Sequence, residues 1–363
     1  MNSLSAEKVP AWTAAVPVAA LALIAAMAAH VVGSGNTAII VLAALLLGAS
    51  VFAAVHHAEI LALKLGEPFG SILLAVAVTV IEVGLIVSFL LSGSDGVETV
   101  ARDTIFSTVM IAVNGVVGLS LIVGGRRHGE LGFKLDGATA ALAVLGTLAV
   151  LSLVMPQFTS SAPGAAYSAV QLLFVALASI ALYTIFIRVQ TIKHRDYFLF
   201  GTDDAEVAVV PSDRHALASL ALLILCLIAV VLLAKQLSYP LDNAISQAGL
   251  PQAFVGVIVA MVVLLPESIA AIKAAVRNKL QVSLNLALGS AIASIGLTIP
   301  AVAVVSLVVA QPIDLGLPPA QTALLALTLL IGTLTLGTGR TTVLQGAIHL
   351  VICSFFLLIS AVP

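Results

Sequence analysis

The run FGSILLAVAVTVIEVGLIVSFLL, from Phe69 to Leu91, carries a single charged residue, Glu82, in a stretch long enough to cross a bilayer as a helix. The run FVGVIVAMVVLLPESIAAI, from Phe254 to Ile272, has the same pattern around Glu267. In each run the glutamate is the fourteenth residue counted from the phenylalanine. A charged side chain in hydrocarbon costs at least about 3 kcal/mol, so an acid at this depth indicates function. The two runs predict a membrane protein with a paired acidic site.

The overall composition agrees with a membrane protein. Of the 363 residues, 61% are apolar and 9% are charged, whereas soluble domains carry charge at about a quarter of their positions. The net charge of −2 gives no basic surface, so no nucleic-acid partner is expected. Cys226 and Cys353 lie far apart in apolar runs, which argues against a disulfide framework or a zinc site. We expect no bound cofactor and no enzyme.

Eleven apolar runs approach the length of about 20 residues that a membrane-crossing helix needs. They cover roughly 11–33, 37–58, 69–91, 103–125, 137–155, 165–187, 216–234, 252–272, 282–310, 319–336 and 341–361. The first is too long for a signal-peptide core and lacks a convincing cleavage site, so it is counted as a span. The predicted fold class is all-α, a polytopic transmembrane helical bundle.

Positive charge sets the expected orientation, because cytoplasmic loops carry the excess of Lys and Arg. With the N-terminus in the cytoplasm, 13 of the 15 Lys and Arg residues fall in cytoplasmic segments. The exceptions are Arg102 and Lys235. A missing or extra span would scramble this asymmetry, so it supports both the eleven spans and a cytoplasmic N-terminus.

The chain also divides into two similar halves. A shift of 185 residues superimposes Phe69 on Phe254 and Glu82 on Glu267. We expect an N-terminal segment with the first helix (1–36), a five-helix repeat (37–190), an acidic cytoplasmic loop (191–214) and a second five-helix repeat (215–363). Because five is odd, the second repeat enters the membrane from the opposite side. Inverted repeats are common in secondary transporters, whose substrate sites lie near the midplane between the repeats.

The central loop is rich in acids. It holds Asp196, Asp203, Asp204, Glu206 and Asp213. A solvated linker is one interpretation of this composition. A segment that collects or senses cations is the other, because carboxylates are oxygen ligands for divalent ions. The spacing does not match an EF-hand calcium loop.

Further oxygen-bearing side chains follow the two glutamates. Pro266 removes a backbone donor beside Glu267 and so frees a carbonyl about one turn earlier. The next span of each half supplies hydroxyl and amide groups, of which Ser107, Ser290 and Asn285 are the predicted cation ligands together with Glu82 and Glu267. Hydrogen bonding between helices is the alternative role of each. His56, His57 and His349 are interpreted as interfacial or packing residues rather than as a proton relay.

These residues resemble the calcium/cation antiporter superfamily, in its calcium/proton exchanger branch and its bacterial ChaA-type members. The similarity rests on HHAEILALKLGEPFGSILLAVAVTVIEVGL (56–85), LLPESIAAIKAAVRNKLQVSLNLALGSAIASIGLTIP (264–300), TGRTTVLQGAIHL (338–350) and the position of the acidic loop. By this resemblance Glu82 and Glu267 fall on the acids of the family's two ion-binding repeats, and Ser107 and Ser290 fall near its small hydroxyl positions.

One departure from the wider family stands beside each acid. The wider family has Gly-Asn three or four residues earlier, and this chain has Val78-Thr79 and Val263-Leu264 there. The ChaA-type branch shares that departure. The resemblance implies export of calcium, with sodium or potassium as alternatives, in exchange for protons across a bacterial inner membrane.

Buried acids in membrane spans also occur in two other classes of function. An intramembrane enzyme could use two buried acids for acid/base or metal chemistry, but the sequence holds no HExxH motif, no paired intramembrane aspartates and no cluster of metal-ligating histidines. A channel or a structural bundle is disfavoured by the inverted repeat. Proton-coupled cation antiport, in which Glu82 and Glu267 also carry the protons, is the predicted function, and a sodium- or potassium-specific antiporter is the alternative.

Overall fold

The computed structural model describes residues 10–31, 33, 35–90, 97–199, 210–309 and 313–363. In this part of the chain, eleven helical segments are long and apolar enough to cross a membrane. They are Ala11–Ala28 (α1), Thr37–Leu65 (α2), Phe69–Leu90 (α3), Val100–His128 (α4, η2 and α5), Leu135–Phe158 (α6, η3 and η4), Ala169–Lys193 (α7 and η5), Asp213–Gln247 (α8), Phe254–Val276 (α9), Leu280–Val308 (α10, η8 and α11), Pro319–Leu336 (α12) and Val343–Ala361 (α13). The all-α polytopic bundle is confirmed. Asp203, Asp204 and Glu206 of the expected acidic loop lie outside the described residues.

Four of these segments contain a turn of π-helix, namely Ile111–Val116 (η2), Val150–Val154 (η3), Val189–Lys193 (η5) and Ser294–Thr298 (η8). A π-turn widens the helix by one residue and therefore changes which side chains face a neighbour further along. The spans that carry η2 and η8 each follow a glutamate helix, α3 or α9. Such turns concentrate at functional sites in many proteins.

The largest departure from the predicted boundaries is in α8. The apolar run predicts a helix over 216–234, and the helix continues to Gln247 for a total of 35 residues. Its last part is polar. Hydropathy therefore shows where the membrane crossing ends, but it does not show where the helix ends. Pro240 lies within this polar extension.

One end of the bundle is joined by contacts between loops that the eleven-span topology places on the same side. Lys64 Nζ lies 2.5 Å from Asp213 Oδ1, between the end of α2 and the start of α8. The two-residue strands Leu131–Gly132 (β1) and Arg340–Thr341 (β2) pair antiparallel, linking the loop after α5 to the loop before α13. These loops all lie on the predicted cytoplasmic side.

Contacts at the other end of the bundle follow the same rule. Arg102 Nη1 donates to the carbonyl of Gly316 at 3.3 Å. Gln157 Nε2 donates to the carbonyl of Leu317 at 2.9 Å. Successive crossings of the membrane place all four residues on the predicted outer side. The contacts at both ends thus agree with the order of the spans, and the orientation relative to the cytoplasm stays a prediction.

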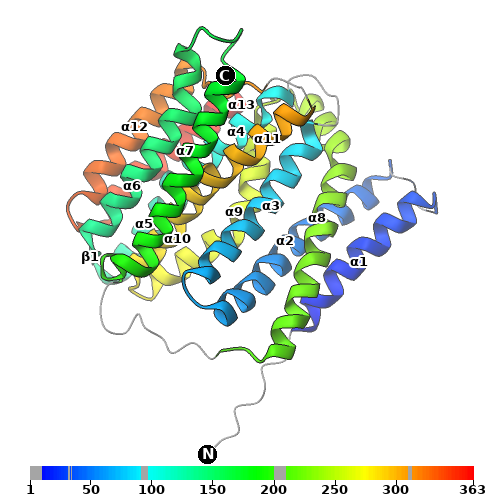
Figure 1. The fold of residues 1–363 in the computed structure, drawn as a ribbon, viewed down its shortest axis with the longest axis horizontal. Coiled ribbons are helices and arrows are strands. Elements are labelled where there is room, and N and C mark those ends of the chain that lie inside the picture. The colour runs from blue at the N-terminus through cyan, green and yellow to red at the C-terminus, as the bar shows by residue number, and fades with distance from the viewer. Residues whose placement is uncertain (1–9, 32, 34, 91–96, 200–209, 310–312) are drawn as a thin grey trace, which may run out of the picture.

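Figure 1 shows how the helices are arranged: α1, α2, α3 and α8 lie together at one side, and α5, α6, α12 and α13 lie at the other. Between them α9 and α10 carry the chain through the middle of the bundle. Buried apolar side chains form a large cluster that runs through α4 to α7 and α9 to α13 and takes in the end of α3, and a smaller one among α2, α3, α8 and α9. The glutamate helices α3 and α9 therefore lie where the two groups meet.

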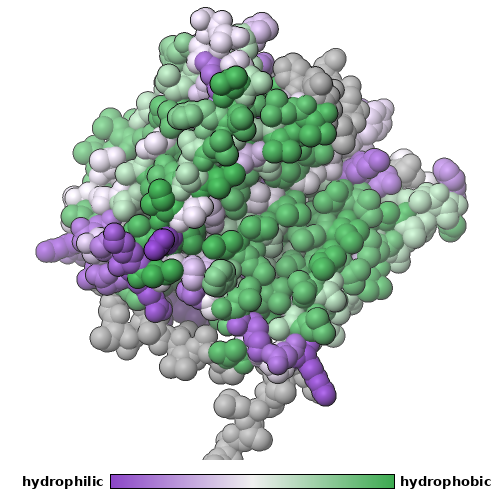
Figure 2. All heavy atoms as spheres, in the orientation of Figure 1, coloured by the Kyte–Doolittle hydropathy of each residue, from purple (hydrophilic) through white to green (hydrophobic). Residues whose placement is uncertain are grey.

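The outer surface of the bundle is apolar along the helices. On the face shown in Figure 2, hydrophobic side chains cover the sides of the helices, and hydrophilic ones gather toward their ends. Lipid tails are as favourable an environment for apolar side chains as a protein core, because both are apolar. This pattern agrees with the membrane assignment.

The bundle is closely packed near its predicted outer end, where α4 meets α9. A Cβ atom built on Gly256 of α9 would lie 2.5 Å from the backbone carbon of Asp103 and 2.6 Å from the nitrogen of Thr104. Only a glycine allows two helices to approach so closely. Asp103 is itself 2% exposed and accepts hydrogen bonds from Arg102 Nε and Thr99 Oγ1, each at 2.8 Å.

Candidate cation-binding site

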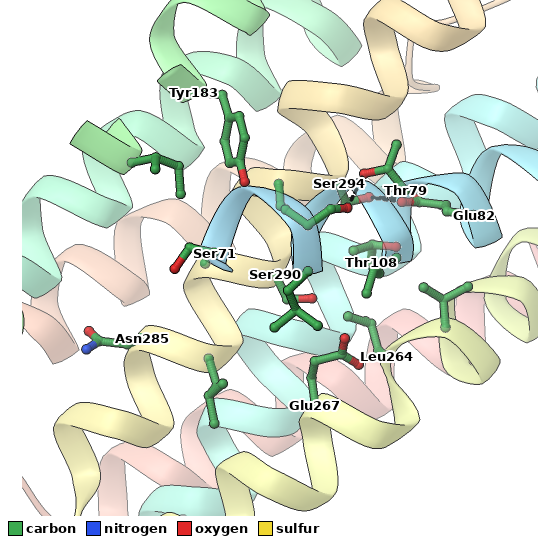
Figure 3. Close-up of a pocket in the computed structure, with 18 of the residues that line it drawn as sticks. Ser71, Thr79, Glu82, Thr108, Tyr183, Leu264, Glu267, Asn285, Ser290 and Ser294 are labelled. Atoms are coloured by element: carbon green, nitrogen blue, oxygen red, sulfur yellow. Dashed lines mark hydrogen bonds between the residues drawn. The ribbon is translucent and has the colours of Figure 1, made fainter. Parts of the chain in front are cut away.

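A cavity of about 210 Å³ lies between α3, α7, α9 and α10, and Glu82 and Glu267 are both among its lining residues. Ser71, Gln190 and Asn285 line its other end, near the predicted cytoplasmic ends of their helices. The cavity therefore runs from the predicted cytoplasmic side toward the middle of the bundle. Figure 3 shows the two glutamates entering it from different helices.

Glu82 is held by two hydroxyl groups of the second half of the chain. It is 1% exposed. Ser294 Oγ lies 2.6 Å from Oε1 and 2.8 Å from Oε2 of the carboxylate, and Thr298 Oγ1 donates to Oε2 at 2.9 Å. Hydrogen bonds to a carboxylate are roughly twice as strong as those between neutral groups. They fix the position of the Glu82 side chain in the wall of the cavity.

The π-turn η8 supplies both donors. Ser294 is its first residue and Thr298 its last. Residues four apart in a helix point to the same side, so one turn of η8 presents two hydroxyls to one carboxylate. Glu82 and its donors are more than two hundred residues apart in sequence, with separations of 212 and 216. This contact joins the two predicted repeats.

Glu267 has a different environment. Its Oε2 is buried and makes no hydrogen bond within the described part of the chain. Pro266, which precedes it inside α9, is buried as well. Glu267 is therefore the carboxylate with an oxygen left open toward the cavity.

Other oxygen atoms line the same cavity. Thr79, Thr108, Tyr183 and Ser290 are among them. The Thr79 hydroxyl donates to the carbonyl of Ala75 at 2.8 Å. The hydroxyls of Thr108 and Tyr183 are buried without a hydrogen-bonding partner in the described part of the chain. The cavity therefore offers neutral oxygens beside the two carboxylates.

The structure separates the other predicted ligands. Ser290 lines the cavity between the levels of Asn285 and Ser294. Asn285 also lines it, although its amide already accepts from Gln281 Nε2 at 2.9 Å and donates to the carbonyl of Phe198 at 2.7 Å. Ser107 is 2% exposed and is not among the lining residues, whereas its neighbour Thr108 is. The ligand roles of Ser107, Ser290 and Asn285 stay predictions.

The histidines lie away from this cavity. His349 Nδ1 is 2.9 Å from Asn114 Oδ1 and its Nε2 is 3.1 Å from Thr335 Oγ1, in a buried network. His57 is fully buried in α2, with its ring 5.5 Å from that of His56. In the described part of the chain, no group of three or more His, Cys, Asp and Glu side chains could hold a metal.

Thr298, which donates to Glu82, and Tyr183 and Gln190, which line the cavity, are among the site residues that sequence reasoning missed. Thr298 could have been found from the sequence, because Ser290, Ser294 and Thr298 recur every four residues and so form one stripe of hydroxyl groups along the helix. Tyr183 left no such signal, since a tyrosine in an apolar run is expected to pack in the core or at the membrane interface.

An all-helical membrane bundle with two buried acids from separate halves, both lining one cavity, has the architecture of a carrier. The family model for the sodium/calcium exchanger protein matches residues 35–192 and 218–362. The chain belongs to that family, which confirms the predicted superfamily. It is a cation exchanger of the antiporter kind and not an enzyme.

Two relatives are similar along most of their length. The putative ionic transporter y4hA of Sinorhizobium fredii is 54% identical over 98% of this chain and 97% of its own. The sodium-potassium/proton antiporter ChaA of Escherichia coli is 35% identical over 90% of this chain and 91% of its own. The second relative supports the predicted ChaA-type membership.

Solved structures share the fold. The structure of YfkE has a TM-score of 0.74 at 18% identity and covers 97% of this chain and 100% of its own. That of the H⁺/Ca²⁺ exchanger CAX has a TM-score of 0.69 at 16% identity and covers 96% of this chain and 92% of its own. At these identities the likeness concerns the arrangement of the helices.

Proposed function

We propose that this protein exchanges cytoplasmic cations for protons, with calcium as the main cation, through a single site formed by Glu82 and Glu267. The observation that carries the proposal is that both carboxylates line one cavity although they come from different halves of the chain. Each carboxylate can hold either a proton or a share of a cation. Binding one therefore displaces the other, and this competition is what antiport requires.

The oxygen supply supports a hard cation. Calcium takes six to eight oxygen ligands, and carboxylates, hydroxyls and water are all suitable. The two glutamates offer four oxygens, and the Ser290 and Thr108 hydroxyls lie on the same lining. Water in a cavity of about 210 Å³ can supply the rest.

A sodium- or potassium-specific antiporter is the second candidate. One relative is described as a sodium-potassium/proton antiporter. In addition, Val78-Thr79 and Val263-Leu264 offer one hydroxyl and no amide oxygen beside the acids. A monovalent cation needs less ligand charge than calcium and gives up its water more easily, so fewer strong ligands suffice for it.

The two five-helix repeats, related by inverted topology, are part of the same proposal. Its support is that each glutamate helix is followed by a span with a π-turn, and that η8 of the second half holds Glu82 of the first. We infer further that the N-terminus lies in the cytoplasm and that the protein resides in a bacterial inner membrane, from the distribution of Lys and Arg and the bacterial relatives.

Exchange in sealed vesicles tests the proposal. Purified protein is reconstituted into vesicles with an acidic lumen and a pH-sensitive dye, and calcium, sodium, potassium or magnesium is added outside. The unsubstituted chain should raise the luminal pH with calcium. Glu82→Gln and Glu267→Gln keep the size and a carbonyl oxygen but lose the titratable charge, so each should abolish the signal at normal amounts of folded protein. Near-normal exchange by either variant would contradict the paired site.

The pH dependence has a definite sign. Protons and the cation compete for the same oxygens, so the half-saturating calcium concentration should rise as the pH on the calcium side falls. Because the carboxylates share one site, they should titrate as a coupled pair. A half-saturating concentration that is independent of pH would show that cation and proton use separate groups.

A further inference from the structure

Tyr183 of α7 has a buried hydroxyl that faces the cavity. The side chain is 4% exposed and lines the same cavity as the two glutamates. Its hydroxyl makes no hydrogen bond within the described residues. Figure 3 shows the ring descending from its helix with the oxygen directed inward, among the other labelled lining residues.

The ring of Tyr183 has little freedom to turn away. A Cβ atom on Gly296 would lie 2.8 Å from Cβ, 3.1 Å from Cγ and 3.3 Å from Cδ2 of Tyr183. Gly296 is the middle residue of η8, the turn whose ends, Ser294 and Thr298, hold Glu82. The tyrosine is thus packed against the element that positions one of the acids, and its hydroxyl keeps a fixed place relative to that acid.

The hydroxyl is costly at this position unless it meets a polar partner. Burying a hydroxyl without a hydrogen bond is unfavourable, and a phenylalanine would fill the same space without that cost. The cavity can supply the partner, because a water molecule needs roughly 10–15 Å³ and the cavity measures about 210 Å³. The open Oε2 of Glu267 and the open hydroxyl of Thr108 lie on the same lining.

We propose that the Tyr183 hydroxyl accepts a hydrogen bond from a water molecule in the hydration shell of the bound cation, and so makes Tyr183 a specificity-determining residue of the exchange site. Water bound to a divalent ion is a stronger donor than water bound to a monovalent ion, because the ion polarises it more. The contact therefore favours calcium over potassium. This inference rests on the proposed function and adds to it a residue from outside the glutamate helices and the spans that follow them.

Tyr183→Phe is the decisive variant, since it removes the oxygen and keeps the ring against Gly296. In the vesicle assay the half-saturating calcium concentration should rise about three- to tenfold, the loss expected for one water-mediated hydrogen bond, while the maximal rate stays within about twofold. For potassium, the half-saturating concentration should change by less than about twofold. Tyr167→Phe is the matched control, because it removes a hydroxyl that donates to the Leu151 carbonyl and does not line the cavity.

The outcomes separate this inference from the proposed function. If the unsubstituted chain does not exchange calcium, the proposed function fails. If it does, and Tyr183→Phe leaves the half-saturating calcium concentration unchanged, or lowers only the maximal rate, the role of Tyr183 is wrong and the paired site stands. Should the variant not be recovered from the membrane, 3-fluorotyrosine placed at position 183 of the full chain provides a second readout. Its fluorine resonance should shift when calcium is added, and an unchanged resonance would overturn the inference.

Discussion

At the scale of single residues, the two glutamates of the site are not equivalent. Glu82 accepts hydrogen bonds from Ser294 and Thr298, whereas Glu267 keeps a buried oxygen without a partner in the described part of the chain. Glu82 and Glu267, which occupy corresponding positions in the two predicted repeats, therefore differ in their hydrogen bonding. In our proposal both carboxylates exchange the cation for protons, and Glu82 is the one that hydrogen bonds hold in place.

Ser294→Ala tests the hydrogen bonds that hold Glu82. The variant leaves Glu82 with the Thr298 hydroxyl alone, and a buried group that loses its partner costs about 1–3 kcal/mol. The midpoint of thermal unfolding in detergent should fall, and the half-saturating cation concentration should rise. Ser354→Ala is the control, because Ser354 is exposed and its hydroxyl bonds only to the Leu350 carbonyl in its own helix. An unfolding midpoint equal to that of the control would show that Ser294 does not support Glu82.

The sequence predicts the acids of the site better than their surroundings. Glu82 and Glu267 stand out because a carboxylate is conspicuous in an apolar run. Hydroxyl residues do not stand out, since they also pack between membrane helices. Which of Ser107 and Thr108 lines the cavity depends on the rotation of α4, and periodicity fixes that rotation only to within a residue. Tyr183 required the three-dimensional contact with Gly296 to be recognised.

At the scale of helices, close packing of α4 against α9 closes the bundle at its predicted outer end. Gly256→Ala should be poorly tolerated there, because the new methyl group would lie within 2.6 Å of two backbone atoms of α4. Overpacking of this kind costs typically about 1–3 kcal/mol. Thermal unfolding of the purified variant should therefore show a clearly lower midpoint.

Gly48→Ala is the matched control for that substitution. Gly48 also lies inside a helix, and a Cβ atom there would meet no atom within 4 Å. Alanine favours helix more than glycine does, so this variant should be as stable as the unsubstituted chain or slightly more stable. If both variants unfold at the same temperature, the contact between α4 and α9 does not limit stability.

The helices themselves were largely predictable, because eleven apolar runs correspond to eleven spans. Their ends were less so. The prediction for α8 ends at 234, before the polar stretch that leads to Gln247, since hydropathy reports the membrane and not the hydrogen bonds of the helix. The π-turns could not be predicted either, because a one-residue widening leaves almost no trace in an apolar sequence.

At the scale of the whole molecule, the topology can be tested directly. Single cysteines are introduced by Arg127→Cys and Gln247→Cys in a chain whose Cys226 and Cys353 have been replaced by alanine. Both target positions are exposed. A membrane-impermeant thiol reagent applied to intact cells should label position 247 and not position 127, because the charge distribution places Arg127 in the cytoplasm. Labelling of both from the same side would contradict the predicted topology.

The position of the cavity, which runs from the predicted cytoplasmic side to the two glutamates, has a consequence for membrane voltage. Water in a cavity that reaches the glutamates from the predicted cytoplasmic side brings the potential of that side toward them, so more of the voltage falls across the closely packed region around Gly256 and Asp103. Each elementary charge that crosses 100 mV gains or loses about 2.3 kcal/mol. Exchange of one divalent cation for two protons moves no net charge through this region, so the rate of such an exchanger does not depend on the membrane potential. At any other ratio of protons to cations, each cycle moves net charge through this region, and the membrane potential then contributes to the driving force for exchange.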